Sequence, residues 1–166
     1  MDDLAIVERQ LGRRPRAFRR VAARCPYGLP VVTEQDPYDG RGEPFPTTYY
    51  LTCRHLVAAV SRLEAAGGVE RWSRRAGTDP ELAASLRDAT GVQRALRRDL
   101  AQGRDGRDDG SSLALGIGGA RDVGNLKCLH AHAAFALARP GYVLGEAILA
   151  EVEPLWPIDG CCSAPR

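Results

Sequence analysis

The chain has 166 residues and a mass of 18.0 kDa, and its 23 basic and 21 acidic residues leave a net charge of only +2. This length predicts a single domain over residues 1–166 that buries its own core without disulfide bonds. The weak net charge does not support nucleic-acid binding, and no apolar run approaches the roughly 20 residues of a membrane span.

The chain begins with Met1-Asp2-Asp3 and leads directly into an amphipathic pattern. A secretory signal would begin with basic residues and an apolar segment instead. We therefore expect a cytoplasmic protein. Its five cysteines are then expected to be buried, metal-bound or reactive thiols rather than a disulfide framework; they are Cys25, Cys53, Cys128, Cys161 and Cys162.

The first part of the sequence predicts a helix, a basic stretch and an extended segment. Apolar residues at helical spacing mark the helix over residues 3–11, and five arginines follow at positions 13–20. We interpret these arginines as a solvated face, with contact to phosphate or an acidic partner as the alternative. Prolines and a glycine in residues 24–32 favour a turn before an extended segment, and residues 36–46 predict a loop.

The best strand candidate is residues 45–52, which are dense in aromatic and β-branched side chains. Thr52 is expected to cap a helix over residues 53–66, which Gly67-Gly68 ends. Cys53 would then lie in the first turn of that helix.

Further helices are predicted after residue 68. A short one is expected around Trp72, and Asp79-Pro80 opens another that runs to about residue 100, with a weakening or break at Thr90-Gly91. A flexible loop is predicted at about residues 102–119, where Gly, Asp, Arg and Ser dominate.

The stretch from Gly116 to His132 holds the chain's only asparagine, Asn125, and its only lysine, Lys127. A helix capped by Asn125 or by Asp122 is expected to follow and to end at residues 139–141. A last helix over residues 143–152 precedes an irregular C-terminal tail from about residue 154. The predicted fold class is α+β, mostly α, with several helices packed around a two- or three-stranded β element.

One hypothesis is a metal site. Cys25, Cys53 and Cys128 could supply three thiolates and a histidine the fourth ligand, a set that zinc accepts tetrahedrally. Positions i and i+4 of a helix share a face, which favours His132 over His130 as the partner of Cys128. Alternatively Cys161 or Cys162 replaces the histidine, and an all-cysteine set would also suit an iron–sulfur cluster.

A second hypothesis is a small cysteine-dependent enzyme that acts on a phosphate or carboxylate. Cys128 would be the nucleophile, and its position near a helix start would lower its pKa. Lys127 would counter the charge of the substrate. Gly118, Gly119 and Asn125 would belong to an anion cradle, although Gly-x-Gly-Gly matches neither the dinucleotide fingerprint nor the phosphate-binding loop of nucleotide hydrolases. The sequence does not decide whether the protein is an enzyme.

Three segments together resemble the signature blocks of the bacterial uncharacterised-domain family 501. They are Arg24-Cys25-Pro26-Tyr27-Gly28-Leu29-Pro30, Phe45-Pro46-Thr47-Thr48-Tyr49-Tyr50-Leu51-Thr52-Cys53 and Leu126-Lys127-Cys128-Leu129-His130. The resemblance, which spans nearly the whole chain, implies no established activity, but it carries counterparts of Cys25, Cys53, Cys128, His130 and a late cysteine.

The same resemblance favours His130 over His132 as a ligand. Arg54 departs from the family pattern, which usually has proline after the second cysteine. The family is common in actinobacteria, and related genes tend to lie near those for enolase, a septum-formation protein and an exopolyphosphatase. A third hypothesis therefore makes the chain a non-catalytic protein partner of the cell-division or polyphosphate machinery.

Overall fold

The computed structural model describes residues 2–162, which form six α-helices and one antiparallel three-stranded sheet. The elements in chain order are α1 (Asp3–Leu11), β1 (Phe18–Arg24), β2 (Pro30–Gln35), β3 (Tyr49–Leu51), α2 (Arg54–Ala65), α3 (Gly68–Thr78), α4 (Pro80–Ala101), the short 3-10 helices η1 (Ser111–Ala114) and η2 (Ile117–Gly119), α5 (Leu129–Ala138) and α6 (Val143–Glu151). The predicted α+β class, weighted towards α, is confirmed.

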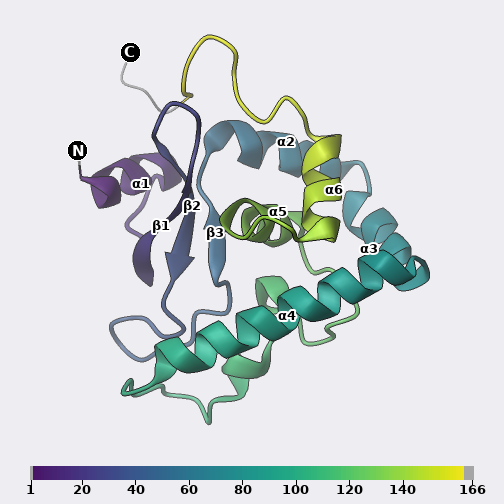
Figure 1. Cartoon of the computed structure of the whole chain (residues 1–166). Coiled ribbons are helices and arrows are strands. Elements are labelled where there is room, and N and C mark those ends of the chain that lie inside the picture. The colour runs from purple at the N-terminus through teal and green to yellow at the C-terminus, as the bar shows by residue number, and fades with distance from the viewer. Residues whose placement is uncertain (1, 163–166) are drawn as a thin grey trace.

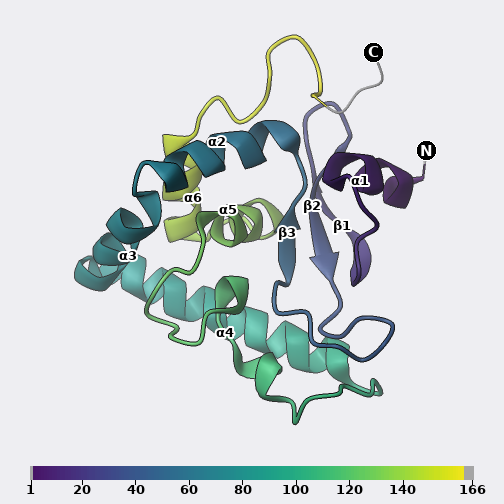
Figure 2. The same ribbon diagram turned by 180° about the vertical axis from the view of Figure 1, so that it is seen from behind.

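Helix α5 lies at the centre of the molecule, between the sheet and α6, with α2 and α4 on either side (Figures 1 and 2). Seven of its ten residues are buried, including Leu129, Ala133 and Phe135, because its sequence is apolar around the whole circumference. The ring of Phe135 packs edge-on against Tyr49 of β3 and Tyr142 at the start of α6. The core therefore joins the sheet to the helices through one central helix.

The sheet has the order β1-β2-β3, with both neighbours of β2 antiparallel to it. All six residues of β2 are buried, as expected for a central strand covered on both faces. Strands β1 and β3 run in the same direction, so their C-terminal ends lie at the same end of the sheet. This end of the sheet carries Cys25, which follows β1, and Cys53, which follows β3 by two residues.

Strand β1 was not predicted, because its first residues belong to the arginine-rich stretch. It is an edge strand, and its arginines pair with acidic side chains of this chain. Arg19 and Arg20 lie 3.3 and 2.7 Å from the carboxylate of buried Glu34 on β2, and Arg16 lies 2.9 Å from Asp39. Each of these three guanidinium groups therefore has a carboxylate partner within the chain.

Helix α4 is continuous over 22 residues, so the break predicted at Thr90-Gly91 is wrong. Thr90 and Gln93 are buried against the core, while Gly91 is exposed. Glycine at an exposed helical position costs about 1 kcal/mol relative to alanine, which the packing of this long helix outweighs.

Arg97 is the largest fully buried side chain of the described residues. Its Nη1 donates to the carbonyl of Phe45 at 2.9 Å, and its Nη2 donates to the carbonyl of Ser112 at 3.3 Å. Burial lowers the pKa of Arg97. The guanidinium therefore fastens two segments that are distant in sequence onto α4.

The loop predicted at about residues 102–119 is irregular up to residue 110 and then forms η1 and η2. Two contacts attach it to the loop before β3. The N–H of Arg107 donates to the carbonyl of Gly42 at 2.8 Å, and the hydroxyl of Tyr38 donates to Asp108 at 2.7 Å. Hydrogen bonds from Ser112 and Tyr38 lower the pKa of Asp108 to about 2.

Among residues 2–162, no single helix has both the length and the apolar composition of a membrane span. The pair α5 and α6 would meet that test only if taken together, and the two helices are bent by 112° at their junction.

Candidate functional site

Four of the five cysteines form two close pairs at one end of the sheet. The sulfur of Cys25 lies 3.8 Å from that of Cys161, and the sulfur of Cys53 lies 3.7 Å from that of Cys162. Both separations exceed the roughly 2.05 Å of a disulfide bond. Cys25 and Cys53 are buried, whereas Cys161 is partly exposed and Cys162 is exposed. The pairs join positions 136 and 109 residues apart in the chain.

The C-terminal segment reaches these cysteines by folding back over α2 towards the β1–β2 turn (Figure 1). Two further contacts hold it there. The hydroxyl of Tyr27, in that turn, donates to the carbonyls of Pro157 and Ile158, and His55 Nε2 lies 2.9 Å from the carbonyl of Pro154. Tyr27 and His55 were not predicted to have this role, because a contact with a distant irregular segment leaves no local pattern.

The expected first-turn positions of Cys53 and Cys128 are wrong by one residue. Each is the N-cap residue, so α2 begins at Arg54 and α5 begins at Leu129. Neither Thr52 nor Asn125 caps a helix. The first N–H of α5 instead donates to the carboxylate of Glu64 on α2 at 2.6 Å.

The expectation that helix starts lower the pKa of these thiols is also wrong. Burial raises the pKa of Cys53 to about 12, against a smaller lowering by the N–H of Leu56. Burial likewise raises the pKa of Cys128. Desolvation of a thiolate outweighs the helix N-terminus at both positions, so neither position favours a thiolate in the absence of a bound metal ion.

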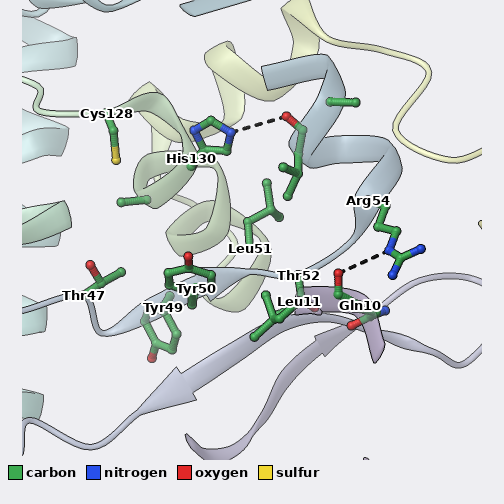
Figure 3. Close-up of a pocket in the computed structure, with 13 residues that line it drawn as sticks. Gln10, Leu11, Thr47, Tyr49, Tyr50, Leu51, Thr52, Arg54, Cys128 and His130 are labelled. Atoms are coloured by element: carbon green, nitrogen blue, oxygen red, sulfur yellow. Dashed lines mark hydrogen bonds between the residues drawn. The ribbon is translucent and has the colours of Figure 1, made fainter. Parts of the chain in front are cut away.

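Cys128 and His130 lie together beside α2 (Figure 3), and neither belongs to the two cysteine pairs. His130 Nδ1 lies 3.2 Å from the carboxylate of Glu64, and Nε2 lies 3.3 Å from the carbonyl of Val57 and 3.2 Å from the hydroxyl of Ser61. A carboxylate and a carbonyl only accept hydrogen bonds. Both ring nitrogens therefore contact groups of α2, and no hydrogen bond between His130 and the Cys128 thiol occurs among the described residues.

His132 does not share a site with Cys128, although the i, i+4 spacing favoured it. Cys128 precedes the helix and has extended backbone angles, so the helical spacing rule does not apply to it. His132 is buried in the core, with Nδ1 2.7 Å from the hydroxyl of Tyr142. Burial lowers the pKa of His132 to about 3, so the ring is neutral at physiological pH.

The predicted anion cradle is closely packed. Gly118 and Gly119 are buried with positive φ angles, and a Cβ added to Gly119 would lie 2.8 Å from the Cβ of Pro46. The side chain of Asn125 donates to Asp122 at 2.6 Å, and Lys127 is exposed. The two glycines are therefore explained by close backbone packing.

The structure does not assemble the predicted ligand set of Cys25, Cys53, Cys128 and His130. Within residues 2–162, no group of three or more histidine, cysteine, aspartate or glutamate side chains is placed to hold a metal ion. Cys25 and Cys53 are each accompanied by a tail cysteine, whereas the sequence offered Cys161 or Cys162 only as a fourth ligand beside Cys25, Cys53 and Cys128.

A cavity of about 550 Å³ opens between α1, β3, α2 and α5 beside Cys128 and His130 (Figure 3). Arg54, at the start of α2, lines it and donates from Nε and Nη2 to the last carbonyls of α1. Arg54 was noted in the sequence only for its departure from the family pattern. Its contact with α1 depends on how two distant helices pack.

Fold and site together define a mostly helical α+β domain with thiol pairs at one end of a small sheet. A family model, described as "Protein of unknown function (DUF501)", matches residues 21–150. This is more than three quarters of the chain, and the chain therefore belongs to that family. No curated protein and no solved structure matches the chain. The matched range includes Cys25, Cys53 and Cys128 and ends before the tail cysteines.

Proposed function

We propose that Cys25, Cys53, Cys161 and Cys162 form a metal-binding thiol centre that fastens the C-terminal tail to the sheet. The observation that supports it is the spacing of the sulfurs, 3.8 Å in one pair and 3.7 Å in the other. Two thiolates on one tetrahedral metal ion lie about 1.63 bond lengths apart, which is about 3.8 Å for Zn–S bonds of about 2.3 Å. Each pair thus has the separation of two ligands on a single metal ion.

The division into two pairs bears on which metal is bound. A single zinc ion requires about 3.8 Å between every two of its four sulfur ligands, so the two cysteine pairs would have to move closer to each other to bind one ion. A [2Fe–2S] cluster has two irons, each bound by two of four cysteine thiolates, and two separate pairs match that division. We propose one metal centre with these two candidate occupants, in a protein that is expected to be cytoplasmic.

Metal analysis of untagged protein purified without oxygen tests the centre. We expect stoichiometric zinc, or iron with acid-labile sulfide and visible absorption. Cys53→Ser should remove the metal and lower the melting temperature. Cys128→Ser is the matched control, because Cys128 is a helix N-cap like Cys53 but lies outside the two pairs, and it should keep the metal.

Three results would contradict the proposal. One is folded protein with less than about a tenth of an equivalent of either metal. Another is equal metal loss in Cys128→Ser. The third is a mass 4 Da below the reduced value in freshly isolated protein, which would show that the pairs are two disulfides. The role as partner of cell-division or polyphosphate proteins stays a prediction from the resemblance.

A further inference from the structure

The cavity beside Cys128 and His130 is separate from the thiol centre, and its size suits a small organic molecule. Its volume of about 550 Å³ lies within the roughly 300–1,000 Å³ of small-molecule sites. Apolar side chains from α1, β3, α2 and α5 form much of its wall, among them Leu11, Leu51, Val57 and Ala131. Elements from three separate parts of the sequence therefore surround a largely apolar space.

The charge of the cavity lining is one-sided. Arg54 contributes a permanent positive charge, and no aspartate or glutamate is among the residues that line the cavity. Its Nε and Nη2 donate to α1 carbonyls, which holds the guanidinium in place. No carboxylate within residues 2–162 lies within ion-pairing distance of Arg54, in contrast to the arginines of β1.

We infer that this cavity binds a small organic anion with an apolar body, whose charged group pairs with Arg54. The apolar wall takes the body of the molecule, and the guanidinium of Arg54 takes its charged group. The guanidinium is planar and suits a carboxylate or a phosphate. The inference is independent of the thiol centre, because none of the four paired cysteines lines the cavity.

Three naphthalene probes of similar shape test the charge preference: 2-naphthoate, 2-naphthalenemethanol and 2-naphthylmethylamine. Binding is measured by chemical-shift changes in ¹H–¹⁵N spectra of the full chain. We expect 2-naphthoate to bind about tenfold more tightly than the alcohol, a difference of about 1.4 kcal/mol. The amine should bind more weakly than the alcohol.

Variants assign the preference to the cavity. Arg54→Gln should reduce the affinity for 2-naphthoate to that for the alcohol, and Arg54→Lys should keep most of the preference because it keeps the charge. Ala58→Trp, which fills the cavity from α2, should weaken the binding of both 2-naphthoate and the alcohol. Arg62→Gln is the matched control, since Arg62 is an exposed arginine on the same helix that does not line the cavity.

The inference is overturned by equal affinities for the three probes, or by no binding of any probe at millimolar concentration. It is also overturned if the folded Arg54→Gln protein keeps the preference for 2-naphthoate. If Arg54→Gln does not fold, the other two variants still test the inference. Arg54→Lys should keep most of the preference for 2-naphthoate, and loss of the preference in Arg62→Gln would place the charge effect outside the cavity.

Discussion

Replacement of His132 should change how the stability of the protein depends on pH. The ring is fully buried on α5, and Nε2 has no hydrogen-bond partner among the described residues. Burial is the physical cause that lowers its pKa from the ordinary 6.5 to about 3. The folded protein therefore keeps the ring neutral over a pH range in which the unfolded chain takes up a proton.

This difference gives the sign and size of the effect. Below pH 6.5 the unfolded chain binds a proton on His132, whereas the folded protein does not until about pH 3. Stability contributed by the neutral ring is thus complete above pH 6.5 and is lost as the pH falls towards 3. The loss amounts to about 1.4 kcal/mol per pH unit, or about 2 kcal/mol between pH 7.5 and 5.0.

Urea unfolding of the wild type and His132→Gln at pH 7.5 and 5.0 measures this contribution. Glutamine cannot titrate, so the variant should lose about 2 kcal/mol less than the wild type between the two pH values, whatever its absolute stability. Tyr142→Phe is the control. It removes the hydroxyl that lies 2.7 Å from Nδ1 but leaves the ring buried, so the steeper pH dependence of the wild type should remain.

The reasoning is refuted if the wild type and His132→Gln lose the same free energy of unfolding between pH 7.5 and 5.0. It is also refuted if Tyr142→Phe removes the difference, because the hydrogen bond rather than burial would then set the titration of the ring.

Two further pairs of variants test the packing by urea unfolding. Arg97→Met leaves the partly buried carbonyl of Phe45 and the buried carbonyl of Ser112 without their donor and should cost roughly 1–3 kcal/mol for the buried one and less for the other, while Arg98→Met at the exposed neighbour should change little. Gly145→Ala puts a Cβ 2.7 Å from the carbonyl of His132 and should separate α5 from α6 with loss of stability. Gly91→Ala, at an exposed position of α4 with open space around it, should instead stabilise the protein by about 1 kcal/mol. Equal effects of the two substitutions would contradict a close approach of α5 and α6 at Gly145.

Most helices were predictable because their signals are local. Asp79 accepts hydrogen bonds from the first N–H groups of α4, Gly12 ends α1 in the left-handed conformation, and residues 143–151 form the last helix as the pattern indicated. Such signals depend on residues within one or two turns. Strand β1 was not predicted because an edge strand exposes charged side chains. In the sequence, such a run of charges cannot be distinguished from a solvent-exposed loop or helix face.

Local sequence patterns predicted most of the helices and the mostly α composition, and they singled out the cysteines as candidates for a site. Only the tertiary structure decided that Cys25 and Cys53 meet the tail, and that Cys128 lies with His130 beside a cavity. The same holds for the high thiol pKa values, since a pKa depends on all the atoms that displace water around the sulfur. Capping and periodicity are read along the chain, whereas sulfur contacts and burial arise between segments that are more than 100 residues apart.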